Sequence, residues 1–310
     1  MNHYHADAKQ IHAMVDRLVM AVTGQPDVAK AWGSLVAPND KVGIKIAASG
    51  GALFTTHREV VEAIVDGLVA AGQSRSSIIV WDRSINDIKE AGYRPGAEGY
   101  QLKGIAPKDG YDQKASITAP LLGKLVWGDL EYRPELGQLE PLSETENTSS
   151  ISHISRILAN EVTKVVNVPV MSNTEVNGIA GCLYNMTIPN IDNWRRFAQG
   201  RGWGASSIAE IYSHPQVGKK VVINIVDGLI AQYAGGPESQ PLFSEEHNTI
   251  YASRDAVALD AIVLQKLEEW RTRNKLPAIG PLAAYVQAAG YGGLGNSSRD
   301  RIQLKSVSGK

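Results

Sequence analysis

The sequence predicts an α/β protein with a mainly parallel sheet covered by helices, and three neighbouring segments indicate this fold. An apolar segment at 41–48 ends in Ser-Gly-Gly, which predicts a strand followed by a turn. Thr56 and Glu59 then have the spacing of a capping box, which predicts the start of a helix. A second apolar segment at 78–82 predicts another buried strand. Strand, helix and strand in this order form a βαβ unit with a right-handed crossover.

Regular patterns recur along the rest of the chain, with one interruption. Helical spacing predicts helices over 9–23, 255–270 and 281–289, and apolar runs predict strands over 162–170, 221–227, 249–252 and 301–307. Prolines and acidic residues interrupt these patterns between 93 and 150, which predicts an irregular insertion or lid outside the centre of the sheet. We therefore expect one α/β domain over 1–310 that carries this insertion.

The composition excludes several classes of protein. Lys plus Arg number 31 and Asp plus Glu 32, and this net charge of −1 lacks the basic surplus of a general nucleic-acid binder. No apolar run approaches the length of a membrane span, and no basic region with an apolar stretch opens the chain. We expect a soluble protein, cytoplasmic as written and periplasmic if a signal has been removed before Met1. A single cysteine, Cys182, excludes an intramolecular disulfide and a four-Cys iron–sulfur cluster.

Candidate site residues lie where predicted strands end, because open parallel sheets bind ligands at that edge. Asp82 and Asp227 each end an apolar strand, and the alternative role for either is a helix cap or a turn. Ser49 and Gly50 precede a predicted helix, whose start can hold an anion. His57 in the first turn would contact that anion, or would simply be an exposed histidine.

The segment 178–190 is unusual because it combines small residues, a lone cysteine and hydrogen-bonding side chains. Tyr184, Asn185 and Asn190 either line a polar site or join loops together. Cys182 has no base nearby in the sequence, which favours a buried inert thiol.

Two further polar residues lie close to predicted element ends. Asn173 follows the strand predicted at 162–170 and is a candidate ligand contact. Arg195 lies in a helix predicted to begin at Asp192 and pairs either with a ligand anion or with a surface acid.

Lys45 lies on an otherwise apolar strand, where a charge is costly unless it is paired or reaches a cleft. We expect Lys45 to extend into the cleft toward Asp227 or an anionic ligand, so that Lys45→Met abolishes ligand binding but leaves the protein folded. The alternative is an edge strand from which Lys45 reaches water.

Two acidic residues at the start of a later helix complete the candidate site. Asp255 lies in the first helical turn, where the helix dipole alone explains a carboxylate, and Asp260 follows among apolar residues. Carboxylate oxygens suit a hard divalent cation, so a metal bound by Asp227, Asp255 and Asp260 in one cleft is a hypothesis.

Several of these segments together resemble the bacterial and archaeal family called domain of unknown function 362. The resemblance rests on blocks at 42–45, 226–228, 235–237, 252–260 and 290–295 and on the segment containing Asn185, and it covers roughly residues 40–300. The family pattern has Lys-x-His after the strand where this chain has Ser172-Asn173-Thr174. The resemblance implies a fold and a site location but no settled reaction.

We therefore expect an enzyme that acts on a small polar or anionic molecule, with a divalent metal as a compatible cofactor. The alternative is a non-catalytic protein that binds or matures a small molecule or cofactor. The sequence names no substrate and no oligomeric state. The expected roles are catalytic for Lys45, Asn185 and Asp227, and ligand-binding for Ser49, Gly50, His57, Asp82, Asn173, Tyr184 and Arg195.

Overall fold

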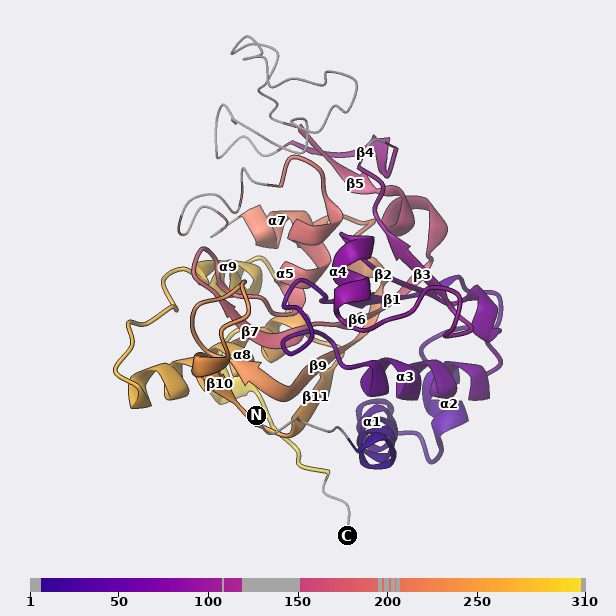
Figure 1. Cartoon of the computed structure of the whole chain (residues 1–310), viewed down its shortest axis with the longest axis horizontal. Coiled ribbons are helices and arrows are strands. Elements are labelled where there is room, and N and C mark those ends of the chain that lie inside the picture. Colours follow the sequence, from indigo (N-terminus) through magenta and orange to yellow (C-terminus); the bar gives the residue numbers. More distant parts are fainter. Residues whose placement is uncertain are drawn as a thin grey trace.

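A mixed, mainly parallel sheet forms the centre of the protein in the computed structural model (Figure 1). The structure describes residues 7–107, 109–118, 151–194, 197, 201, 204 and 207–307. The main path of strands follows the order β3-β2-β1-β6-β9-β7-β8, and β10 and β11 pair antiparallel with β9. The strands are β1 (Val42–Ile46), β2 (Ile79–Asp82), β3 (Gln101–Gly104), β6 (Lys164–Val168), β7 (Val170–Thr174), β8 (Gly178–Ile179), β9 (Val221–Gln232), β10 (Ser244–Glu245) and β11 (Thr249–Ser253). The predicted fold class is confirmed.

Helices cover both faces of this sheet (Figure 1). One face packs against α1 (Ala8–Thr23), α2 (Val28–Gly33) and α3 (Arg58–Ala70), and the other against α5 (Cys182–Thr187), α7 (Ser207–Ser213), α8 (Ala256–Arg273) and α9 (Ala284–Tyr291). Alternate residues of each strand point to opposite faces. Ile223 and Ile225 of β9 accordingly join the core below α1 and α3, whereas Val226 joins the core below α5 and α8.

β1 lies inside the sheet, between β2 and β6, and pairs with both in parallel. The chain leaves β1 toward α3 on one face and later reaches α5 on the other face. Such a point of diverging connections is where open α/β sheets bind ligands. Pro169 separates β6 from β7, and its carbonyl accepts a hydrogen bond from the backbone N–H of Asp227 at 2.9 Å.

Two local predictions are wrong. Thr56 does not cap a helix: His57 precedes the first turn of α3, and Thr56 Oγ1 accepts from Ala47 N at 3.0 Å and donates to Val168 O at 2.7 Å. This tertiary pairing joins the ends of β1 and β6 and takes the hydroxyl away from the helix. The predicted last strand at 301–307 is irregular, after a 3₁₀ turn over Arg299–Arg301.

The predicted insertion begins at the edge of the sheet. After α4 (Ile85–Glu90), β3 forms the edge, and β4 (Tyr111–Thr118) pairs with β5 (Ile151–Ser155) in a separate antiparallel sheet. Residues 119–150 lie outside the described part, so the proposed lid and the single-domain arrangement stay predictions.

The remaining short helices are 3₁₀ turns at Arg75–Ser77, Ile188–Asn190, Gly218–Lys220 and Pro241–Phe243 and a π-helix at Ile157–Glu161. Among the described helices, none is long and apolar enough to cross a bilayer.

Candidate functional site

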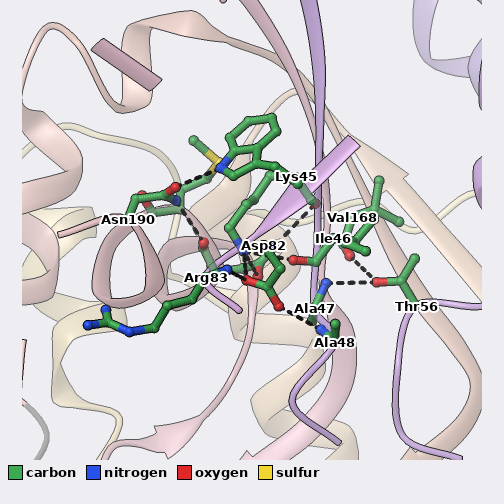
Figure 2. Close-up of polar contacts among 12 residues, drawn as sticks. Lys45, Ile46, Ala47, Ala48, Thr56, Asp82, Arg83, Val168 and Asn190 are labelled. Carbon is green, nitrogen blue, oxygen red and sulfur yellow. Dashed lines mark hydrogen bonds and ion pairs between the residues drawn. The ribbon is translucent and has the colours of Figure 1, made fainter. Parts of the chain in front are cut away.

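A buried ion pair joins the ends of β1 and β2 (Figure 2). Lys45 is fully buried, and its Nζ lies 2.6 Å from Oδ1 of Asp82. The ammonium also donates to Ile46 O at 2.7 Å and to Asn185 Oδ1 at 3.1 Å. Burial lowers the pKa of Lys45, and the charge and hydrogen bond of Asp82 oppose this effect. The predicted partner, Asp227, is wrong because Lys45 pairs with Asp82, and the alternative of an edge strand is wrong because β1 lies between β2 and β6.

The carboxylate of Asp82 is also held by the backbone around it. Its Oδ2 accepts from Ala48 N at 2.7 Å, and its Oδ1 accepts from Arg83 N at 2.8 Å (Figure 2). The pair therefore fixes the turn after β1 and the turn after β2 in one arrangement. Charge-assisted hydrogen bonds of this kind are stronger than neutral ones.

Amide side chains extend this network across the sheet. Asn185 Nδ2 donates to Asn167 Oδ1 at 2.8 Å, and Asn167 Nδ2 donates to Asn224 Oδ1 at 2.8 Å. Asn224 Nδ2 donates in turn to Ser253 O at 3.4 Å, at the end of β11. The amides thus link α5, β6, β9 and β11. Asn167 and Asn224 were not predicted, although an amide in the middle of an apolar strand is a detectable signal because burial demands a partner.

The side chain of Asn190 joins this segment to β2, as in one of the two alternatives for its amides. Its Oδ1 accepts from the indole N–H of Trp81 at 2.9 Å (Figure 2), and its Nδ2 donates to the carbonyls of Asn185 and Met186. Cys182 is fully buried, and burial raises the pKa of its thiol. These features favour the expected inert thiol.

Arg83 and Tyr184 form the partly exposed rim beside the ion pair. The Arg83 side chain extends away from Asp82 (Figure 2), donates to Ile191 O at 3.0 Å and lies over the ring of Trp194 at 5.1 Å. Burial raises the pKa of Tyr184 to about 12, with Arg83 lowering it and Asp82 raising it. Arg83 was not predicted, although it directly follows a strand-end aspartate.

The loop after β1 is tightly turned. An added Cβ on Gly50 would lie 1.9 Å from the carbonyl oxygen of Phe54, so only glycine fits there. Ser49 is exposed at the start of this turn. Both residues lie at the predicted edge of the sheet, and their role as ligand contacts stays a prediction.

A second charged pair joins the start of α3 to β9. Oδ2 of Asp227 accepts from the backbone N–H of His57 at 2.7 Å and lies 2.8 Å from its ring Nδ1. Asp227 is fully buried, and the His57 side chain is 12% exposed, so solvent reaches the imidazole but not the carboxylate. Burial disfavours the charged ring, but the charge and hydrogen bond of Asp227 outweigh it, and the pKa of His57 is raised.

The other two predicted metal ligands bind backbone amides. Asp255 caps α8 through Ala258 N at 2.9 Å and also accepts from Asn296 N at 2.8 Å. Asp260 accepts from the N–H groups of Cys182 and Leu183 at 2.5 and 2.9 Å. Burial raises the pKa of Asp260 to about 7, although these hydrogen bonds lower it.

The structure does not bring the three carboxylates together. Asp227 contacts α3 on one face of the sheet, and Asp260 contacts α5 on the opposite face. Within the described residues, no group of three or more His, Cys, Asp or Glu side chains is arranged to hold a metal ion. The shared cleft and the metal set of Asp227, Asp255 and Asp260 were therefore wrong, because the sequence does not show which sheet face each residue reaches.

Asn173 and Arg195 complete the predicted set. Asn173 is fully buried, donates to Glu175 Oε1 at 2.8 Å and accepts from Gly236 N at 3.1 Å, so it joins the ends of β7 and β9. Arg195 lies outside the described residues, and its role stays a prediction.

Fold and site together define an α/β protein with a polar edge at the divergence of β1 and β6. A profile of the family described as "Domain of unknown function (DUF362)" matches residues 41–265. The chain therefore belongs to this family. The match ends before the glycine-rich block at 290–295, so it is shorter than the resemblance expected from the sequence.

Comparisons with individual proteins are less informative. No curated protein matches the chain significantly. A crystal structure of a protein from Thermotoga maritima, determined by a structural genomics consortium, is similar with 13% sequence identity and a TM-score of 0.42. The similarity covers 80% of this chain and 58% of that protein. The fold described above rests on the sheet topology.

Proposed function

We propose that this protein is an enzyme that acts on a small anionic molecule at the edge where β1 and β6 diverge, with His57 as the group that moves a proton. The observation that carries this proposal is the contact between the partly exposed ring of His57 and the buried carboxylate of Asp227. A carboxylate that fixes one ring nitrogen orients the imidazole and stabilises its charged form.

The tautomer of His57 follows from this contact. When the ring is neutral, Nδ1–H donates to Asp227, which leaves Nε2 as the basic nitrogen. The raised pKa favours the protonated imidazole, the form that can give a proton as a general acid. Asp227 thus acts as a positioning residue, and His57 transfers the proton.

Arg83 is the side chain we assign to the substrate anion. Its guanidinium is partly exposed beside Tyr184, and guanidinium groups bind carboxylates and phosphates in bidentate geometry. Lys45 and Asp82 are saturated by each other and by neighbouring polar groups. We therefore propose that they hold the loops around the substrate rather than contact it, and that Asn185 does the same.

The experiment separates an enzyme from a binding protein. The melting temperature of the purified protein is measured with phosphate monoesters, short dicarboxylates and nucleoside monophosphates. Each anion that raises the melting temperature is then incubated with the protein, and its conversion is followed by mass spectrometry. We expect at least one anion to stabilise the protein and to be converted.

His57→Asn provides the decisive variant, because an Asn amide can still donate to Asp227. We expect it to bind the same anion but to convert it about 10²- to 10⁴-fold more slowly. His12→Asn is the matched control, since His12 is partly exposed and also pairs with carboxylates, Asp16 at 3.1 Å and Asp66 at 3.4 Å. Binding without conversion by the unmodified protein would favour the non-catalytic alternative, and normal conversion by His57→Asn would exclude the role of His57.

A further inference from the structure

A cavity lies between α1, β11, α8 and the segment 302–307, which we call the C-terminal strap. We propose that this cavity binds an amphipathic carboxylate with a long apolar chain, that is, a fatty acid. Its volume is about 460 Å³, within the range of pockets that hold small molecules. The described lining residues are Met14, Leu18, Ala21, Val22, Asn248–Ser253, Ala258, Leu259, Ile262 and the strap.

Helix α1 contributes a second apolar row to the cavity, beside the row that it buries in the core. Ile11, Val15 and Val19 recur every four residues and are buried against the core. A second row with the same spacing, Met14, Leu18 and Val22, is only partly buried and lines the cavity. Residues four apart lie on one face of a helix, so this row forms a continuous apolar wall.

The buried residues of the cavity lining are apolar, and its polar residues are partly or fully exposed. Ile250 of β11 and Leu259 and Ile262 of α8 are each no more than 4% exposed. Asn248 and Gln303, by contrast, are exposed. Apolar Ala21 and Leu304 are exposed as well, so an apolar base lies below a mixed rim, which accommodates a molecule with a hydrocarbon chain and one polar end.

The charge of the cavity lining indicates which end group the molecule carries. Lys305 of the strap is exposed and is the one charged side chain among the described lining residues. An ammonium without an acidic neighbour in this lining is complementary to an anion, which makes a carboxylate the fitting end group. The charge pair would be solvent-exposed and weak, so affinity comes mainly from burial of the chain.

The strap can admit such a ligand because few contacts hold it. Residues 302–307 have no regular secondary structure, and β11 pairs only with β9 among the described strands. Within the described residues, the hydrogen bonds to the strap backbone involve its first residue: Ile302 N donates to Arg299 O at 3.1 Å, and Ile302 O accepts from Arg299 Nη1 at 2.8 Å. Side-chain packing therefore holds the strap over the cavity.

Binding is measured with dansyl-labelled undecanoic acid, followed by fluorescence, with decanoic acid and decanol as competitors. We expect saturable binding, and stronger displacement by the acid than by the alcohol.

Leu18→Trp fills the cavity and is expected to weaken binding at least about tenfold. Ala21→Trp, from an exposed lining position, is the second filling variant should Leu18→Trp fail to fold. Val69→Trp on the exposed side of α3 is the matched control and should bind normally.

Lys305→Glu tests the charged end. We expect it to weaken binding of the probe and of decanoic acid roughly three- to tenfold and to leave the dissociation constant of decanol, corrected for the weaker probe, unchanged. Lys219→Glu, at an exposed lysine outside the cavity lining, is the control. Absence of saturable binding would overturn the site, and unchanged binding in folded filling variants would overturn its location. Equal displacement by acid and alcohol would overturn the assignment of a carboxylate.

Discussion

Replacing Lys45 with Met is expected to destabilise the protein strongly. The variant removes a fully buried ammonium and leaves the charge of Asp82 to two backbone N–H groups of the described structure, those of Ala48 and Arg83. It also removes the donor from Asn185 Oδ1 and from the carbonyl of Ile46. Breaking a buried ion pair by removing one partner typically costs about 3–5 kcal/mol, a large part of the roughly 5–15 kcal/mol that stabilises a domain.

The free energy of unfolding is measured by urea denaturation followed by circular dichroism. We expect Lys45→Met to lose about 3–5 kcal/mol, and the double variant Lys45→Met/Asp82→Asn to lose less, because it removes the unpaired charge. Lys30→Met is the matched control, since Lys30 pairs with Asp27 at 3.2 Å on the surface, and it should lose less than about 1 kcal/mol.

A loss below about 1 kcal/mol for Lys45→Met would refute this reasoning. The same result would revive the expectation drawn from the sequence, in which the variant stays folded and loses only ligand binding. A variant that fails to fold while the double variant folds would instead support the structural role of the pair.

Three further predictions concern protonation and packing. The pKa of His57 is raised by Asp227, so the contribution of their charged pair to stability is complete below about pH 6.5 and is lost as the pH rises through the higher folded pKa. The melting temperature of His57→Asn should therefore change less with pH across this window than that of the unmodified protein. Burial raises the pKa of Asp260 to about 7, so its protonated form favours folding, and the free energy of unfolding falls as the pH rises from about 4 to about 7. In Asp260→Asn, the free energy of unfolding measured in urea should lack this decline. An added Cβ on Gly43 would lie 2.6 Å from the ring of Trp81, so Gly43→Ala should cost about 1–3 kcal/mol in urea unfolding, whereas Gly33→Ala, with open space around it, should not be destabilised by crowding.

Most of the sheet could be predicted from the sequence because buried parallel strands are continuous apolar runs. Strands β1, β2, β6 and β9 all follow this rule. The capping box at Thr56 and Glu59 failed because a local pattern does not reveal that Thr56 bonds to Val168, which is 112 residues away. The strand predicted at 301–307 is wrong because, in the described structure, the backbone of this segment has no neighbouring strand to pair with.

The candidate site was predicted residue by residue but not as an arrangement. Lys45, Asp82 and Asn185 were each selected for their position at a strand end or in a buried segment. Their pairing depends on sheet register and on the approach of α5, which connects residues up to 140 positions apart. The same limit explains the metal hypothesis, because residues on neighbouring elements can still reach opposite faces of a sheet.

Two aspartates of the block at 252–260 each pack against a glycine that is distant in the sequence. An added Cβ would lie 2.2 Å from Asp260 Oδ1 at Gly181 and 2.1 Å from Asp255 Oδ1 at Gly295. Each carboxylate therefore needs a glycine beside it to reach the backbone N–H groups that it binds, which explains why an acidic block and glycine-rich blocks occur in one sequence. Because these oxygens are occupied by backbone donors, we expect the reactive groups among partly exposed side chains at the polar edge, of which His57 has a buried carboxylate to orient it.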